Sequence, residues 1–344
     1  MEPKVSIKKI LIGNSVVIGV ILFLMIFFSD VFYLFELKTL DVRYILRDAT
    51  SNKPRIHNSI VNINIDDYSI KESGKISEWP KDYYSSLINK LSDSNPKIIA
   101  CDIIFADSDD TLGNGKLVKA IDNSGIVVTP FLYSEVLREN NNQQLYENFI
   151  ENSGLEFMPN FPSDAISWKM KHLLFTSMED IVNYSLSTGF VNITPDPDGI
   201  VRRVPMLINF EGKLSLSLFF QSLCDYLDYD PSQIEIVNEH EIRLTNFPGK
   251  ESDENSNFTI YLDRSGQLPI NYVGQYNIEN YPETKSAWDI IISKDRINFD
   301  NKLLILSDVS VIKSDYKSTP LEGVIPGSYI YTNAISSILN QDLL

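Results

Sequence analysis

The sequence predicts an α/β protein with a mixed, largely parallel β-sheet flanked by helices and preceded by one N-terminal transmembrane helix. Three observations support this prediction. Strand-like and helix-like segments alternate between residues 59 and 133, the strand-like segments are apolar on both faces, and residues 10–28 form a long apolar run ahead of them. The chain has 344 residues, of which 43% are hydrophobic, so it can bury a large core.

The apolar run at residues 10–28 follows a segment with three lysines. A helix of this length covers about 28 Å, close to the hydrocarbon thickness of a bilayer. No small-residue cleavage site follows the run, so we expect residues 1–36 to be an uncleaved signal anchor, with a cleaved signal peptide as the alternative. The lysines predict a cytoplasmic N-terminus and place residues 37–344 outside the inner membrane as one extracytoplasmic domain.

The elements that follow the anchor are predicted in order from their apolar spacing. Helical spacing continues to about residue 48, and regular spacing is lost between about residues 135 and 186, which we expect to be a long insertion. Between these segments the predicted elements are a strand at 59–66, a helix at 81–94, a strand at 96–107, a helix at 113–125 and a strand at 126–133.

Regular spacing returns after residue 186, and no break in composition marks a second folded domain. The predicted elements are a hairpin across residues 211–213, a helix at 214–227, a strand pair at 231–247, a second strand pair across 264–266, a helix at 285–293, a strand at 301–308 and a helix at 327–341.

Composition and motifs exclude several classes of function. A formal net charge of -16 argues against nucleic acid as a partner. The three histidines are isolated, and the sequence has neither a phosphate-binding loop nor a nucleophile elbow, so we predict no catalytic residue, metal site or cofactor. Cys101 and Cys224 lie in apolar runs and are expected to be buried free thiols, with a disulfide as the alternative.

Acidic residues gather where the first two predicted strands end. Asp66 closes the first strand, Asp102 lies within the second, and Asp107 follows it. Carboxyl ends of parallel strands meet at one edge of a sheet, where ligands bind, so these side chains are candidates for one crevice. In the simpler interpretation Asp66 caps the turn that follows it. We expect the same capping or solvated role for Asp67, Asp109 and Asp110.

The stretch ITPDPDGIVRRVPMLI, residues 193–208, carries turn-forming residues between apolar runs. Aspartate closes turns through its side chain, and glycine accepts a positive φ. We therefore predict that Asp196, Asp198 and Gly199 form the turn of a hairpin rather than a metal site.

The two arginines after this turn are predicted to point to opposite faces of a strand, because side chains alternate along it. A carboxylate inside the apolar run around Asp102 is costly to bury without a partner. We therefore expect the inward member of Arg202 and Arg203 to reach a buried carboxylate, Asp102 or Asp66, and the other to point to solvent.

Several separated segments also match one family in order and spacing, from about residue 37 to the end of the chain. They are LDVRYILRD, IVNINIDDYSI, WPKDYYSSLINKL, PKIIACDIIFAD, GFVNITPDPDGIVRRVPML, LPINYVG, KLLILSD, DYKSTPL and IPGSYIYTNAISSIL. Together they resemble the second type of CHASE domain, the extracellular sensor of bacterial nucleotide cyclases, histidine kinases, serine/threonine kinases and diguanylate cyclases. The chain departs from the family pattern at Lys81 and Asp82, at Ser307, where glycine is usual, and at Tyr331, where histidine is frequent.

The resemblance implies a sensory domain without enzymatic activity of its own. It implies an input domain that passes a small ligand or an envelope signal across the membrane to a cytoplasmic cyclase or kinase beyond this chain. The expected partners are membrane lipid, an unknown ligand or envelope protein, and a second copy through the membrane helices. The expected ligand-binding or structural polar core comprises Asp66, Asp102, Arg202, Arg203, Asp315 and Thr319. The alternative is a membrane-tethered hydrolase that uses paired carboxylates.

Overall fold

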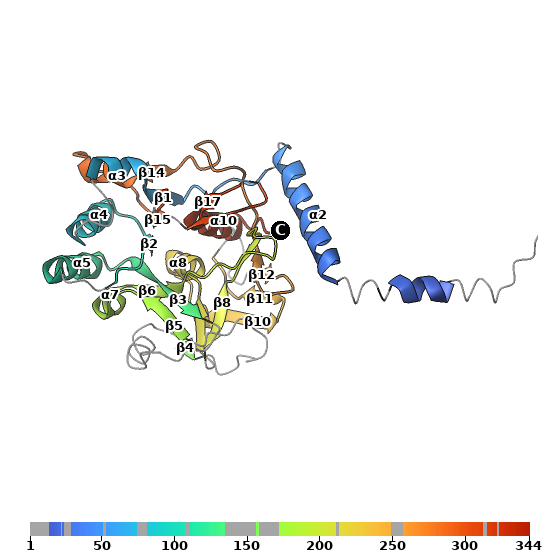
Figure 1. The fold of residues 1–344 in the computed structure, drawn as a ribbon. Coiled ribbons are helices and arrows are strands. Elements are labelled where there is room, and N and C mark those ends of the chain that lie inside the picture. The colour runs from blue at the N-terminus through green and yellow to red at the C-terminus, as the bar shows by residue number, and fades with distance from the viewer. Residues whose placement is uncertain are drawn as a thin grey trace, which may run out of the picture.

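Figure 1 shows the fold in a computed structural model of the chain. The structure describes residues 14–21, 23, 29–50, 53–73, 81–106, 110–134, 156–157, 172–210, 213–248, 257–311, 315–321 and 323–344. In this part of the chain no helix is long and apolar enough to cross a membrane. Residues 1–13, 22 and 24–28 of the expected anchor, and Asp107 and Asp109, lie outside the described residues.

A central sheet of seven strands runs in the order β14, β1, β15, β2, β3, β5, and β6 also pairs with β3. The β3–β5 pair is antiparallel, and the other pairs between described strands are parallel. The predicted mixed, largely parallel sheet is therefore confirmed. Its strands are β1 (Ile60–Ile65), β2 (Ile98–Asp102), β3 (Val127–Ser134), β5 (His172–Thr176), β6 (Ser187–Phe190), β14 (Thr284–Ser286) and β15 (Leu303–Asp308).

Helices cover both faces of this sheet (Figure 1). On one face, Val61 and Ile63 of β1 share an apolar core with Leu87 and Leu91 of the helix Lys81–Asp93. On the other face a separate core forms, because alternate side chains of each strand point to opposite sides. The first layer holds α3 (Asp67–Ser73), α4 (Lys81–Asp93), α5 (Thr111–Ser124), α7 (Glu179–Tyr184) and α9 (Ala287–Ile292); the second holds α8 (Leu218–Leu227) and α10 (Gly327–Leu339).

The contact between α10 and the sheet is polar as well as apolar. Thr332 Oγ1 donates to Asn62 Oδ1 at 2.7 Å, and Asn64 Nδ2 donates to the Tyr329 hydroxyl at 2.8 Å. All four side chains are buried, so the hydrogen bonds offset the loss of water and fix the register of α10 on β1.

Several local predictions are confirmed. Cys101 and Cys224 are buried free thiols. Asp110 caps α5, because its Oδ1 accepts from the backbone N of Gly113 at 2.9 Å. The same helix ends at Gly125, which adopts a left-handed φ of 63°.

Smaller sheets make up the second half of the chain. The predicted hairpins β8–β9 and β10–β11 are present. The expected pair across residues 264–266 is wrong: β12 pairs with β11, and β13 pairs with β7. These elements are β4 (Glu156–Phe157), β7 (Arg203–Val204), β8 (Leu207–Phe210), β9 (Lys213–Leu216), the 3-10 turn η2 (Pro231–Gln233), β10 (Ile234–Asn238), β11 (Glu241–Leu244), β12 (Phe258–Tyr261), β13 (Leu268–Pro269), β16 (Tyr316–Lys317) and β17 (Ile325–Pro326).

The region expected to be an insertion contributes directly to the central sheet. Its described C-terminal part forms β5 and α7, and β5 pairs with β3. Residues 135–155 and 158–171 lie outside the described residues.

Helix α2 (Ser29–Asp48) precedes β1 and lies along one side of the described part of residues 53–344 (Figure 1). Its inner face packs through Leu37 and Tyr44, which are both buried. The Tyr44 hydroxyl donates to the Ile270 carbonyl at 2.7 Å, and Arg47 Nη2 donates to the Tyr272 carbonyl at 2.7 Å. The helix is therefore seated on the segment that contains β13.

Candidate functional site

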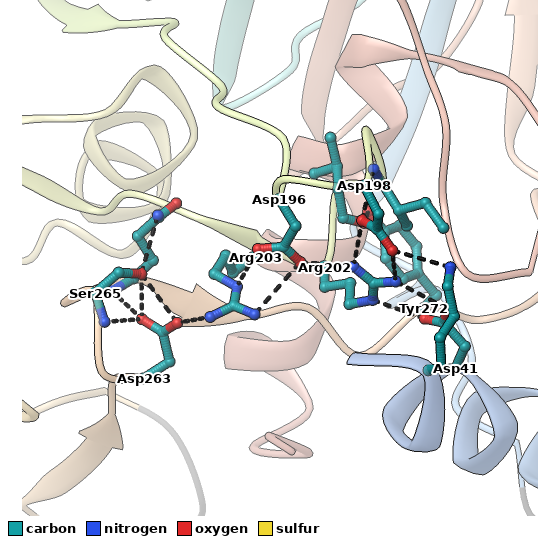
Figure 2. Close-up of polar contacts among 12 residues, drawn as sticks. Asp41, Asp196, Asp198, Arg202, Arg203, Asp263, Ser265 and Tyr272 are labelled. Atoms are coloured by element: carbon teal, nitrogen blue, oxygen red, sulfur yellow. Dashed lines mark hydrogen bonds and ion pairs between the residues drawn. The ribbon is translucent and has the colours of Figure 1, made fainter. Parts of the chain in front are cut away.

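Two polar regions contain the residues singled out in the sequence. One lies at the carboxyl ends of β1, β15 and β2, and we call it the carboxyl edge. The other lies between α2 and the turn before β7, and we call it the arginine cluster (Figure 2). The carboxyl edge includes Asp66, Asp102, Asp308 and Asp315; the arginine cluster includes Asp41, Asp196, Asp198, Arg202, Arg203 and Asp263.

Asp66 has a structural role at the carboxyl edge. Its Oδ1 accepts hydrogen bonds from the Ser69 backbone N at 2.8 Å, from the Ser69 hydroxyl at 2.7 Å and from the Ser286 hydroxyl at 3.0 Å. These contacts cap α3 and connect it to the end of β14. The simpler interpretation of Asp66 as a cap is therefore confirmed.

Asp102 ends β2 beside Ser307 of the neighbouring strand β15. Burial and the nearby Asp315 carboxylate raise the pKa of Asp102 from 3.8 to about 7, and Lys317 opposes that rise. No described residue donates a hydrogen bond to its carboxylate. The protonation of Asp102 therefore depends on its burial and on the two charged neighbours, Asp315 and Lys317.

The segment at residues 315–319 lies between the two polar regions. Lys317 Nζ pairs with Asp315 Oδ1 at 2.9 Å, and the Asp315 carbonyl accepts from the Gly327 backbone N at 2.8 Å. At the other end of the segment, the Ser318 carbonyl accepts from Val201 N at 2.7 Å, and Thr319 beside it is buried. One short segment thus contacts both the surroundings of Asp102 and the residue before Arg202.

The turn at residues 196–200 forms as predicted. Gly199 N donates to the Asp196 carbonyl at 2.8 Å, and Asp196 N donates to the Ile200 carbonyl at 2.9 Å. Gly199 has a φ of 81°, which β-branched residues do not adopt cheaply. The flanking strands, however, do not pair with one another, because β6 pairs with β3 and β7 pairs with β13.

Arg202 is the centre of the arginine cluster, and its side chain is 1% exposed. Its Nε and Nη2 donate to the two carboxylate oxygens of Asp41 at 2.7 and 2.8 Å. Its Nη1 and Nη2 donate to Asp198 at 2.9 and 2.7 Å, and Nη1 also donates to Asp196 at 2.8 Å. All the N–H groups of the guanidinium face a carboxylate, which only the planar fork of arginine allows.

These contacts shift proton affinities in opposite directions. Burial would lower the pKa of Arg202, but its hydrogen bonds to Asp41, Asp198 and Asp196 raise it above the ordinary value. The hydrogen bonds from Arg202 hold the pKa of Asp198 well below its usual range. Arg202 and Asp198 therefore both stay charged over the physiological pH range.

Arg203 extends the cluster toward the turn between β12 and β13. Its Nε lies 3.2 Å from Asp196 Oδ1, and its Nη1 pairs with Asp263 Oδ2. Asp263 is held in turn by the Ser265 hydroxyl at 2.8 Å (Figure 2). The expectation that one arginine points to solvent is wrong, because both side chains are enclosed by carboxylates.

The expected partners of the arginines are also wrong: Arg202 binds Asp41, Asp196 and Asp198, not Asp66 or Asp102. The physical reason is local, since the turn folds its own aspartates back onto the arginine that follows them. The spacing of Asp198 and Arg202 was a visible signal for this contact. Asp41 lies 161 residues away from Arg202, and no spacing could indicate that pair.

A cavity of about 330 Å³ lies beside the cluster, between α2 and the turn that carries Asp263. Leu37 and Leu40 of α2 form part of one wall, and Leu262 and Pro269 form part of the opposite wall. Arg203 lines it as well.

The model of the family described as the CHASE2 domain matches residues 17–344. The chain belongs to the CHASE2 domain family. CHASE2 is a family of extracellular sensor domains, so its members are sensory rather than catalytic modules. A search of curated proteins and a search of solved structures each returned no match.

Two of the departures of this CHASE2 domain from its family pattern, at Ser307 and Tyr331, fall where α10 packs on the sheet. The Tyr331 ring stacks on Phe219 with centroids 6.0 Å apart, and its hydroxyl donates to the Val191 carbonyl at 2.8 Å. The hydroxyl groups of Ser307 and Ser328 lie 2.8 Å apart. Both substituted positions are thus integrated into the packing between α10 and the sheet.

Proposed function

We propose that this CHASE2 domain is the extracytoplasmic input domain of a bacterial membrane receptor. It is anchored through residues 1–36 and acts on a cytoplasmic nucleotide cyclase or kinase. The observation that supports the proposal most is the buried bond between Arg202 and Asp41. This bond attaches residues 53–344, which we call the sensor body, to α2. Helix α2 is the element that follows the apolar N-terminal run.

The carboxyl edge is the proposed input site. In open α/β sheets, ligands bind outside the carboxyl ends of the strands, and Asp102 lies there with a charge that depends on its surroundings. A ligand at this edge would act by binding one arrangement of residues 315–319 better than another. Because the Ser318 carbonyl holds Val201, a shift there reaches Arg202 and then Asp41 on α2.

The hydrolase alternative receives less support. A glycosidase needs two carboxyl groups about 5–10 Å apart and free to act on a substrate. Asp66 is engaged by Ser69 and Ser286 as a helix cap, and so it is not placed to serve as a partner of Asp102.

The proposal can be tested by measuring coupling between the carboxyl edge and α2. Cysteines at Arg43 on α2 and Asp122 on α5 are exposed and can carry spin labels in the full chain in nanodiscs, while Cys101 and Cys224 are buried. We expect Asp102→Asn to change the distance distribution between the labels. Adding Arg202→Met should abolish that change, because the route to Asp41 is cut.

A binding screen complements this measurement. Small amines, sugars and carboxylates are tested for a rise in the melting temperature of the full chain. A hit should lose its effect in Asp102→Asn and should shift the label on α2. A compound that binds at Asp102 without moving α2, together with no effect of Asp102→Asn on the labels, would contradict the proposed route. Hydrolysis of a glycoside would favour the alternative.

A further inference from the structure

The outer face of α2 is exposed along its length and is apolar apart from Lys38. Soluble surfaces seldom leave such a contiguous apolar stripe uncovered. The exposed fractions on this face are 47% for Val31, 67% for Phe35, 52% for Val42 and 55% for Ile45, and Leu46 beside Ile45 is 63% exposed. None of these side chains belongs to the two cores of the sensor body.

The stripe has the spacing of a coiled coil. Its positions are 31, 35, 38, 42, 45 and 49, which alternate steps of four and three residues as the a and d positions of a heptad do. They carry Val31, Phe35, Lys38, Val42, Ile45 and Ala49. Because a helix turns about 100° per residue, this stripe faces away from Leu37 and Tyr44. The sensor body therefore leaves it accessible.

A parallel partner helix explains this pattern better than a lipid surface does. A lipid surface selects apolar residues without a 3–4 spacing, yet polar Glu36, Thr39 and Arg43 border the stripe. The same spacing continues back to Val17 and Ile21, which are helical and exposed. Two chains anchored in one membrane by this end would present the stripe in the same direction.

We propose that α2 pairs in parallel with α2 of a second copy of this chain, and that Lys38 links the pairing to the arginine cluster. Lys38 is the charged position of the stripe, and two lysines facing each other would repel. Its Nζ is instead held by Asp198 Oδ2 at 2.9 Å and Asp41 Oδ2 at 3.4 Å. Those same carboxylates bind Arg202.

The arrangement makes the pairing depend on the state of the sensor body. With the cluster intact, Lys38 is drawn toward Asp198 at the edge of the stripe, and its charge is balanced. If the turn moves away, Lys38 is released into the seam, and a charge at a core position weakens a coiled coil. The pairing rests on α2, its parallel direction rests on the proposed membrane anchor, and its use as an output rests on the proposed sensor function.

Disulfide cross-linking in membranes tests the pairing. The full chain carries either Val42→Cys, within the stripe, or Arg43→Cys, an exposed neighbour outside it, and the parent with its buried Cys101 and Cys224 gives the background. We expect Val42→Cys to give several-fold more product at twice the 39.2 kDa chain mass. Equal yields from the two variants, or no product from Val42→Cys, would overturn the pairing.

Two further variants in the Val42→Cys background test the cause. Ile45→Lys should lower the yield by placing a charge in the seam, without changing the melting temperature of the body. Asp198→Asn should lower it as well, although residue 198 lies on the turn and not on α2. An unchanged yield in Asp198→Asn with a reduced yield in Ile45→Lys would refute the Lys38 link and keep the pairing. Failure of the ligand screen with intact cross-linking would count against the sensor function alone.

Discussion

The arginine cluster and the carboxyl edge both concentrate aspartates, but only the first encloses them around a buried cation. In the cluster, Arg202 donates to three carboxylates, and Arg203 joins a fourth. At the edge, Lys317 pairs with Asp315, and Asp102 receives no hydrogen bond from a described residue. The difference is structural: one region holds α2 through buried ion pairs, and the other leaves the Asp102 carboxylate without a hydrogen-bond donor among the described residues.

The pKa values of one aspartate in each region are shifted in opposite directions. Hydrogen bonds from Arg202 depress the pKa of Asp198, so this carboxylate stays ionised. Burial raises the pKa of Asp102 to about 7, so its charge changes near neutrality. The charged arginine cluster holds α2, and the carboxyl edge contains a carboxyl that titrates near neutrality. In this arrangement a change of charge at the carboxyl edge can affect α2.

The largest effect is expected when the arginine cluster is disrupted. Arg202→Met leaves Asp41, Asp196 and Asp198 without their shared cation, and should cost about 3–5 kcal/mol of the free energy of unfolding. Arg243→Met is the matched control, because Arg243 pairs with Glu235 and Glu241 at the surface and its loss should cost under about 1 kcal/mol. Urea denaturation of both variants measures the difference. Similar losses would show that Arg202 contributes no more than a surface ion pair.

The second prediction concerns the edge. The raised pKa of Asp102 means that the folded domain prefers the protonated carboxyl, so this group costs little below about pH 4 and most above about pH 7. Asp102→Asn should therefore raise the free energy of unfolding by about 1–3 kcal/mol at pH 8.5 and by much less at pH 5. Stability curves at the two pH values check this. A variant destabilised at pH 8.5 would mean that the ionised carboxylate has a cationic partner after all.

The third prediction concerns the turn at residues 196–200, which carries two aspartates of the arginine cluster. Gly199 has no neighbouring atom within 4 Å of an added Cβ, so its positive φ alone should make Gly199→Ala cost about 1–2 kcal/mol. Gly115 in α5 is equally open, with no such φ, and Gly115→Ala should stabilise by about 0.5–1 kcal/mol. Opposite shifts of the melting temperature are expected. If both variants shifted the melting temperature in the same direction, the positive φ of Gly199 would not explain the effect of its substitution.

Sequence reasoning located most elements of the fold because their signals are local. The helix at α4 and the strands β1, β2 and β3 follow from apolar spacing, and the Asp110 cap and the Gly125 terminus follow from residue type. The pairing of β13 with β7 could not be predicted, because its partner lies about sixty residues earlier and both strands have two residues.

The same distinction explains the candidate site. The turn around Gly199 was predictable from its residues, and its geometry brings Asp196 and Asp198 to Arg202. The Asp41 partner comes from α2 and depends on how the helix is seated, which no local pattern encodes. The expected arginine partner of Asp102 is absent among the described residues; its carboxyl is half-buried, and its pKa is raised.

The smallest expected effect concerns the two charged neighbours of Asp102 at the carboxyl edge. Asp315 raises the pKa of Asp102 and Lys317 lowers it, so replacing each one should move the titration in opposite directions. Asp315→Asn removes a like charge and frees Lys317 from its pair, which should lower the apparent pKa of Asp102. Lys317→Met removes the opposing cation and should raise it. Each shift should be about half a pH unit, because charges that are partly solvated interact by under about 1 kcal/mol.

Carboxyl resonances followed by NMR during a pH titration measure both variants, and Asp102→Asn identifies the signal. Shifts in the same direction would mean that the two residues act through packing of residues 315–319 rather than through their charges, and the carboxyl edge would then differ from the arginine cluster in structure but not in electrostatic response.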